Sequence, residues 1–241
     1  METVKIETGI EGFDEVLGGG IPSGHVVLIS GLPGTMKSSL AYAILHNNTR
    51  ANGSKCLYVS LEQTKRSFYS QMESMGFDVK ATEGGLHVVD IGSMQKQAKR
   101  NASVIWMDLL KKMLETKRKI DGLDMVVLDS LEALEVLAQF ENRRTALFHL
   151  FEWLRDLEVI SLVLTEAPPE QTLLGLDQSL PRNDEGYLSD GILHLKMHQV
   201  NDVTMQRRLR VVKMRSANHR TGFFALAFED GKFSVTRALS T

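Results

Sequence analysis

The chain has 241 residues, 28 lysines and arginines against 30 aspartates and glutamates, a formal charge of −2, and 43% hydrophobic residues. This composition excludes a disordered chain, the length suits one α/β domain over residues 1–241, and the near-neutral charge argues against a protein that coats nucleic acid. The sequence has neither a run of about 20 apolar residues nor the basic-then-apolar start of a signal peptide, so we expect a cytoplasmic protein that is neither membrane-inserted nor secreted.

Short apolar runs alternate with amphipathic segments through the first two thirds of the chain. The runs are rich in valine, isoleucine and leucine, which is typical of strands buried on both faces of a parallel sheet. The predicted strands are 25–30, 56–61, 86–91, 125–128 and 160–165, and the predicted helices are 38–49, 64–75, 103–118 and 139–158. The only cysteine, Cys56, lies in an apolar run and is expected to be a buried, unreactive core residue.

The last of these helices has a pronounced apolar face. Leu147, Leu150, Phe151 and Leu154 recur at positions i, i+3, i+4 and i+7. We expect this stripe to pack on the sheet as core, not to bind a partner.

The pattern changes after residue 167. Residues 168–187 are polar, contain several prolines and lack a period, which predicts a long surface loop. Beyond it, 191–200, 205–215 and 222–235 have the pattern of strands, with a turn at 229–232. A chain that begins as βαβ units and ends in strands predicts an α/β fold whose mostly parallel sheet is extended at one edge by antiparallel strands.

Residues 31–38, Gly-Leu-Pro-Gly-Thr-Met-Lys-Ser, follow a predicted strand and precede a predicted helix, as a phosphate-binding loop (P-loop) does. Gly31 and Gly34 let the backbone wrap so that its N–H groups point at phosphate oxygens. Lys37 is expected to reach the β- and γ-phosphates, and the Ser38 hydroxyl to ligate Mg²⁺. The usual pattern has glycine where Met36 stands, so this side chain must point away from the phosphates or force the loop open.

Two carboxylates are predicted at the carboxyl ends of strands, the edge where α/β sheets bind ligands. Asp129 ends the run 125–128 in the manner of a Walker B strand and is expected to hold Mg²⁺ through water. Glu62 follows the run 56–61 and is expected to orient or deprotonate the attacking water, the alternative being a glutamate that stabilises the next helix N-terminus. The residues predicted to bind ATP are Gly31, Pro33, Gly34, Thr35, Met36, Lys37, Ser38, Ser39 and Asp129, with Ser38 and Asp129 also binding the metal.

The order of these motifs resembles one family. Residues 8–24, which lead into the P-loop, resemble the entry of the KaiC-like branch of RecA-type ATPases, and Glu62, Asp129, 165–166, 188–191 and 213–215 follow that family's order. The resemblance spans residues 4–237 and is to a single KaiC-type module of the stand-alone kind found in archaea. It implies a RecA-like fold, a ring of identical subunits that is commonly a hexamer, and ATP and Mg²⁺ bound between subunits.

The chain departs from this family at two places. The family usually has two adjacent glutamates where Glu62 is followed here by Gln63, which predicts weaker hydrolysis. The two-module clock protein has a Ser-Thr phosphoacceptor pair where this chain has Gly186 and Tyr187, so autophosphorylation at that pair is not expected.

Residues 205–220 carry six cations and no acid: Arg207, Arg208, Arg210, Lys213, Arg215 and Arg220. Strand alternation predicts that Arg207, Lys213 and Arg215 share one face. The resemblance makes Lys213 and Arg215 groups that reach a neighbouring subunit's γ-phosphate, as arginine fingers do. The alternatives are a nucleic-acid groove and a solvated edge strand whose charges prevent aggregation.

The residues with expected catalytic roles are Glu62, Lys37, Arg215 and Lys213. The leading interpretation is a Mg²⁺-dependent ATPase that turns over slowly at subunit interfaces and uses nucleotide state to control ring assembly or a regulatory protein partner. A RecA-type DNA-binding ATPase and a nucleotide-sensing scaffold without turnover remain as alternatives.

Overall fold

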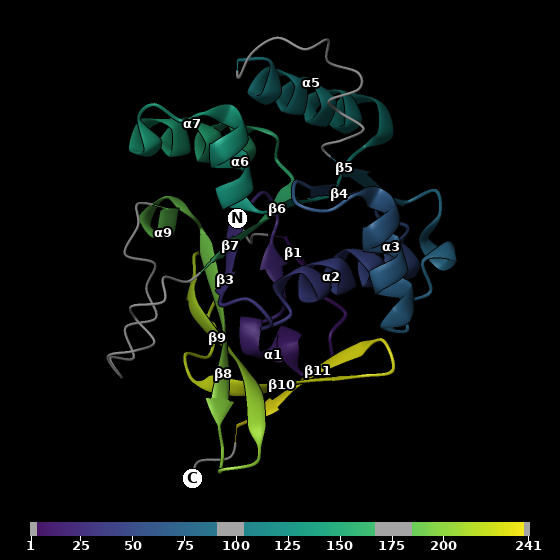
Figure 1. The fold of residues 1–241 in the computed structure, drawn as a ribbon, viewed down its shortest axis with the longest axis vertical. Coiled ribbons are helices and arrows are strands. Elements are labelled where there is room, and N and C mark those ends of the chain that lie inside the picture. Colours follow the sequence, from purple (N-terminus) through teal and green to yellow (C-terminus); the bar gives the residue numbers. More distant parts are fainter. Residues whose placement is uncertain (1–3, 91–103, 167–184, 239–241) are drawn as a thin grey trace.

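The computed structural model describes residues 4–90, 104–166 and 185–238. The described residues form a mixed sheet of nine strands in the order β11-β10-β9-β8-β3-β7-β6-β4-β5 (Figure 1). Parallel pairing joins β3 (Val26–Gly31), β4 (Cys56–Ser60), β5 (Leu86–Asp90), β6 (Met125–Asp129), β7 (Ile160–Glu166) and β8 (Gly191–Gln199). Antiparallel pairing adds β9 (Met205–Met214), β10 (Phe223–Glu229) and β11 (Lys232–Arg237) at one edge. The fold class predicted from the sequence is therefore confirmed.

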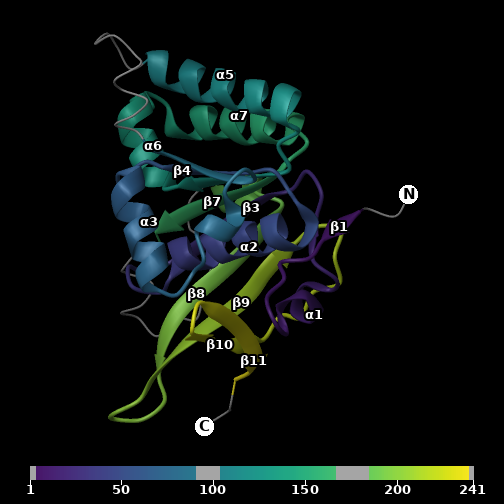
Figure 2. The ribbon, with the colours of Figure 1, turned by 90° about the vertical axis from the view of Figure 1, so that its right-hand side faces the viewer.

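Helices cover both faces of the parallel part of the sheet (Figures 1 and 2). One face is covered by α2 (Lys37–Asn52) and α3 (Lys65–Ser74), and the other by α5 (Val104–Asp121), α6 (Leu131–Ala138) and α7 (Arg143–Asp156). The short helix α1 (Phe13–Leu17) packs against the antiparallel strands β9 and β11. The remaining elements are β1 (Lys5–Ile6) paired with β2 (Ile21–Pro22), a 3₁₀ turn at Lys80–Thr82, and α9 (Glu185–Leu188). Among the described helices, none combines the length and apolar character that a membrane span needs.

The alternation of side chains along each strand divides the core into two layers. In β3, Val27 and Ile29 face α2, whereas Val26 and Leu28 face α7, and all four are fully buried. This double burial explains the continuous apolar runs of the sequence. The stripe of Leu147, Leu150, Phe151 and Leu154 on α7 is also buried against the sheet, as predicted.

The predicted parallel strands end within one residue of the observed ones, and the predicted helix 139–158 corresponds to α7, which is shorter at both ends. Its start lies four residues later than predicted, because Gln139 adopts a left-handed conformation that ends α6, and Asn142 caps the start of α7. The helix α6 was not predicted, although Ser130 caps it by accepting a hydrogen bond from the Ala133 amide. Within the predicted loop 168–187, residues 168–184 lie outside the described residues, and the last three begin α9.

A β-bulge corrects the predicted face of the basic strand. Ile192 pairs with Lys213 but Leu193 pairs with Val211, so that Val212 is an extra residue in β9. The extra residue reverses the alternation, which places Lys213 on the face of Arg210 and opposite to Arg207. The prediction that Arg207 and Lys213 share a face is therefore wrong.

Candidate nucleotide-binding site

The P-loop joins the carboxyl end of β3, a central strand of the sheet, to the start of α2. Gly31 is packed so tightly that an added Cβ would lie 2.6 Å from the Leu195 carbonyl oxygen. Gly34 has a φ of +84°, and an added Cβ there would meet no atom within 4 Å. The first glycine is required by packing and the second by backbone conformation, and the loop leaves open space beside Gly34.

Met36 has a φ of 72°, the left-handed conformation that glycine adopts without strain. Its side chain packs against the core, away from the open side of the loop. Thr35 is buried, and both its hydroxyl and its amide donate to the Leu32 carbonyl. The Ser39 hydroxyl donates to the Met75 sulfur, so this side chain also points away from the loop.

The Lys37 ammonium lies across the loop and donates to the Gly31 carbonyl oxygen at 2.7 Å. Partial burial lowers the pKa of Lys37, and the charges of Glu166, Asp129, Glu132 and Glu62 oppose that shift. One cation therefore faces four carboxylates at the carboxyl end of the sheet. These carboxylates would repel bound phosphates, and Mg²⁺ would supply positive charge that reduces the repulsion.

Asp129 lies at the end of β6 beside Ser60 of β4. Its Oδ2 accepts a hydrogen bond of 2.5 Å from the hydroxyl of Tyr58. Burial raises the pKa of Asp129, while hydrogen bonds from Tyr58 and Ser38 act in the opposite direction. Ser38 of the P-loop and Asp129 thus approach one another, which is the arrangement needed to share one hydrated Mg²⁺.

Glu62 reaches this group from the segment after β4. Its Oε1 accepts a hydrogen bond of 2.5 Å from the Ser130 hydroxyl. Thr64, two residues later, caps α3 through its own side chain. The Glu62 carboxylate is therefore held toward the Walker B strand, not at the N-terminus of α3, and this supports the catalytic interpretation over the structural one.

Sequence reasoning missed three side chains at this site. Tyr58 and Ser130 hold the two predicted carboxylates, and Glu132 on α6 accepts hydrogen bonds from the Thr165 hydroxyl and the Glu166 amide. Ser130 could have been found from the sequence, because it directly follows the predicted metal-binding residue Asp129. The other two contacts join strands and helices far apart in the sequence, so no local pattern indicates them.

Lys213 and Arg215 lie at the opposite end of the sheet from the P-loop. Asp190, just before β8, accepts hydrogen bonds from Arg155 at 3.0 Å, from Arg215 at 2.8 Å and from the Val26 amide. The Lys213 ammonium donates to the carbonyl oxygens of Gly186 and Ser189 at the end of α9. The Arg215 side chain is 52% exposed.

The length of β3 separates these cations from the P-loop of the same chain. Asp190 contacts Val26, the first residue of β3, whereas Gly31 ends this six-residue strand. A strand rises about 3.3 Å per residue, so roughly 16 Å lie between the two positions. Arg215 is therefore at the wrong end of the strand to serve the P-loop of its own chain.

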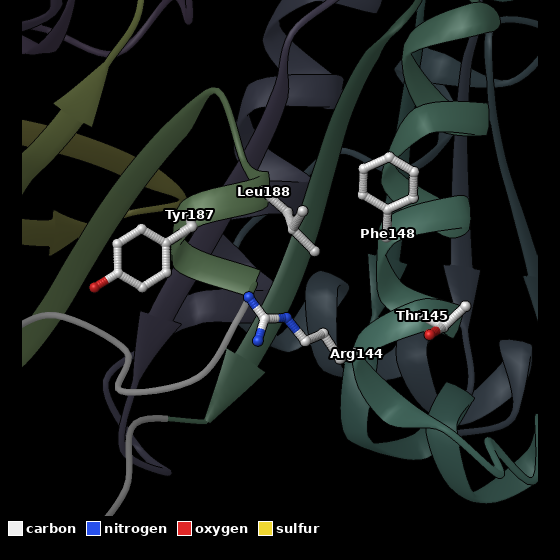
Figure 3. Close-up of a pocket in the computed structure, with 5 residues that line it drawn as sticks. All are labelled: Arg144, Thr145, Phe148, Tyr187 and Leu188. Atoms are coloured by element: carbon white, nitrogen blue, oxygen red, sulfur yellow. The ribbon is translucent and has the colours of Figure 1, made fainter.

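A pocket of about 340 Å³ lies between α7 and α9. Figure 3 shows Leu188 directed toward Phe148 of α7, while the Tyr187 ring points away from that helix. The pocket also contains Arg144 and Thr145. None of these residues belongs to the P-loop or to its carboxylates, so the pocket is separate from the candidate nucleotide-binding site.

A family model described as the ATPase KaiC matches residues 6–239. The chain therefore belongs to the KaiC family of ATPases, within the RecA-like class that its fold indicates. It is 30% identical over 223 residues to a UPF0273 protein of Aeropyrum pernix, covering 89% of this chain and 86% of that protein, and equally identical to a UPF0273 protein of Thermotoga maritima.

A longer relative also matches the chain, and a solved structure shares its fold. The chain is 28% identical to the circadian clock protein KaiC2 of Synechocystis, with 98% of this chain covering 40% of that protein. It spans less than half the length of that relative. A KaiC-like protein of Pyrococcus horikoshii has the same fold, with a TM-score of 0.78, 24% identity, and coverage of 97% of this chain and 99% of that one.

Proposed function

We propose that this protein is a single-domain, Mg²⁺-dependent ATP-binding protein that hydrolyses ATP slowly at the interfaces of a homo-oligomeric ring, with residues 1–241 as the domain. The six-fold ring implied by the family resemblance is the assembly we favour. Nucleotide state would control ring assembly or a regulatory protein partner.

One observation supports this proposal most strongly. The loop 31–38 and two carboxylates lie at one end of β3, and an exposed arginine held by Asp190 lies at the other end, roughly 16 Å away. The P-loop end has the groups that would bind nucleotide and metal, and the other end has the arginine that the P-loop of the same chain cannot reach. A ring in which the Arg215 end of one subunit meets the P-loop end of the next joins the two halves.

Each residue at the P-loop end has a role in this proposal. The loop amides and Lys37 bind the phosphates, and Ser38 and Asp129 hold the metal, which when bound neutralises phosphate charge. Glu62, oriented by Ser130, positions water for attack on the γ-phosphate. Arg215 of a neighbouring subunit stabilises the charge that develops in the transition state.

The nucleic-acid alternative is less well supported by the arrangement of the basic strand. Arg207 lies on the opposite face of β9 from Arg210 by ordinary strand alternation, and the bulge puts Lys213 on the face of Arg210. Arg210 donates to the Thr221 carbonyl and packs on the Phe223 ring, and Lys213 is bound by carbonyl oxygens. Because backbone carbonyls of the same chain already engage Arg210 and Lys213, these two side chains are poorly placed to bind a phosphate backbone.

The replacement Lys37→Ala tests nucleotide binding directly. We expect ATP affinity measured by calorimetry to fall at least about tenfold, because hydrogen bonds to charged groups contribute about 1.5–3 kcal/mol. The matched control is Lys232→Ala, an exposed lysine on β11 at which affinity should be unchanged. Equal affinity of the Lys37 variant and wild type would remove the P-loop assignment, and ATP binding without phosphate release by wild type would favour the scaffold without turnover.

A further inference from the structure

Tyr58 is a buried tyrosine whose hydroxyl ends at the candidate metal site. It lies in the middle of β4, is fully buried, and donates to Asp129 Oδ2 at 2.5 Å. The two residues are 71 positions apart in the chain but belong to neighbouring parallel strands. A hydroxyl in an apolar core costs stability unless it is paired, and here its partner is a carboxylate assigned to the metal.

The ring of Tyr58 is fixed by other aromatic side chains. Its centroid lies 4.3 Å from that of Phe68 and 6.4 Å from that of Tyr42, and both neighbours are buried. Because the ring has little freedom, its hydroxyl stays directed at the end of β6. A fixed donor restricts the rotation of the carboxylate that it contacts.

We propose that Tyr58 positions Asp129 for Mg²⁺, an inference that rests on the proposed function. The tyrosine hydroxyl engages Oδ2 and so limits how the Asp129 carboxylate can turn beside Ser38, with which that carboxylate also interacts. Tyr58 is a positioning residue because it acts through Asp129 and does not touch the nucleotide. Replacement of such partners behind a metal ligand weakens metal affinity by about 10–100-fold.

The experiment compares Tyr58→Phe with Tyr42→Phe, each of which removes one hydroxyl from the same buried aromatic cluster. Mn²⁺, used as the paramagnetic substitute for Mg²⁺, is titrated into protein saturated with ADP, and free Mn²⁺ is measured by electron paramagnetic resonance. We expect Tyr58→Phe to bind Mn²⁺ about tenfold more weakly, and Tyr42→Phe to match wild type. ADP affinity in EDTA should be unchanged in both variants, which also confirms that they are folded.

The outcomes separate this inference from the proposed function. If wild type binds no ADP even with Mg²⁺ or Mn²⁺ present, the proposed function fails and the inference with it. If ADP binds but both variants retain the wild-type Mn²⁺ affinity, only the inference is overturned. An equal loss in both variants also overturns it, because a general effect of removing a core hydroxyl would then explain the result.

A measurement on the unaltered protein decides the question if Tyr58→Phe does not fold. The chain has four tyrosines, so ¹³C labelling of their ζ carbons gives few resonances to assign. Adding Mg²⁺ to the ADP-bound protein should shift the Tyr58 resonance and leave that of Tyr42 in place. An unmoved Tyr58 resonance would overturn the inference.

Discussion

At the scale of single residues, Met36 gives the P-loop its shape at a cost in backbone strain. A left-handed conformation is unfavourable for residues other than glycine, and packing of the Met36 side chain against the core offsets part of this cost. The side chain does not obstruct the phosphate side of the loop. Of the two possibilities considered for Met36, a side chain directed away from the phosphates is the one observed.

Two replacements of Met36 separate strain from packing. Met36→Ala loses the packing and keeps the strain, whereas Met36→Gly loses both, so urea unfolding should find the glycine variant about 1 kcal/mol more stable than the alanine variant. We expect ATP affinity of Met36→Gly to stay within about threefold of wild type, since the loop already has the required conformation. Much weaker binding by Met36→Gly would mean that the methionine side chain contributes to the site.

Glu62 is the residue on which hydrolysis should depend. Glu62→Gln retains an oxygen that can accept from Ser130, so the geometry is preserved while the base is lost. We expect ATP to stay bound and phosphate release to fall by about 10²–10⁴-fold, the usual contribution of a positioned general base. Glu73→Gln on α3 is the control, and its rate should equal that of wild type. An unchanged rate in the Glu62 variant would assign water activation to another carboxylate, such as Glu166.

At the scale of elements, Asp190 ties the start of β8 to α7 and to the residue after β9. It accepts from Arg155 on α7, from Arg215 and from the first amide of β3. Although burial by itself raises the pKa of Asp190, the Val26 amide and the two guanidinium groups outweigh that effect and leave the pKa below its usual value. Asp190 therefore stabilises the fold in its ionised form.

The variant Asp190→Asn should be less stable than wild type by about 1–3 kcal/mol near pH 7, because it removes charge-assisted hydrogen bonds. Solvent partly screens the bond to Arg215, whose side chain is exposed, and this lowers its share of the loss. Because the pKa of Asp190 is lower in the folded protein than in the unfolded chain, where it is about 3.9, ionised Asp190 stabilises the fold at any pH above that unfolded-state pKa. This stabilisation is lost as the pH falls through the folded-state pKa. The difference in unfolding free energy between wild type and variant should therefore shrink below about pH 4 in urea titrations. A difference that is constant from pH 7 to pH 3 would contradict this account.

At the scale of the whole molecule, the two ends of β3 carry complementary halves of the proposed active site. Because Arg215 lies too far from its own P-loop, an isolated subunit should be nearly inactive. Turnover per subunit is then expected to rise with protein concentration as the ring assembles.

A mixture of two inactive variants tests this shared site. Arg215→Ala subunits keep Glu62, and Glu62→Gln subunits keep Arg215, so some interfaces in a mixed ring join both intact groups. We expect phosphate release to reappear on mixing, whereas concentrating either variant alone should give none. If subunits exchange freely and the mixture stays inactive, Arg215 has no catalytic role in a neighbouring subunit.

Local patterns in the sequence determined the P-loop, the strands, most helices and the family. The Gly31 and Gly34 turn, the buried runs and the Asp129 strand end are all encoded by a few adjacent residues, whose conformational and burial preferences act over short distances. The order of these elements along the chain also predicted that the antiparallel strands extend one edge of the sheet.

Only the tertiary structure decided which side chains meet. The order β6-β4 brings Tyr58 to Asp129, and the β9 bulge moves Lys213 away from the face of Arg207. Strand order and register follow from how all the elements pack together, and a single extra residue reverses a face. For that physical reason, no local pattern in the sequence could predict the partner of Asp129 or the position of Arg215 opposite the P-loop.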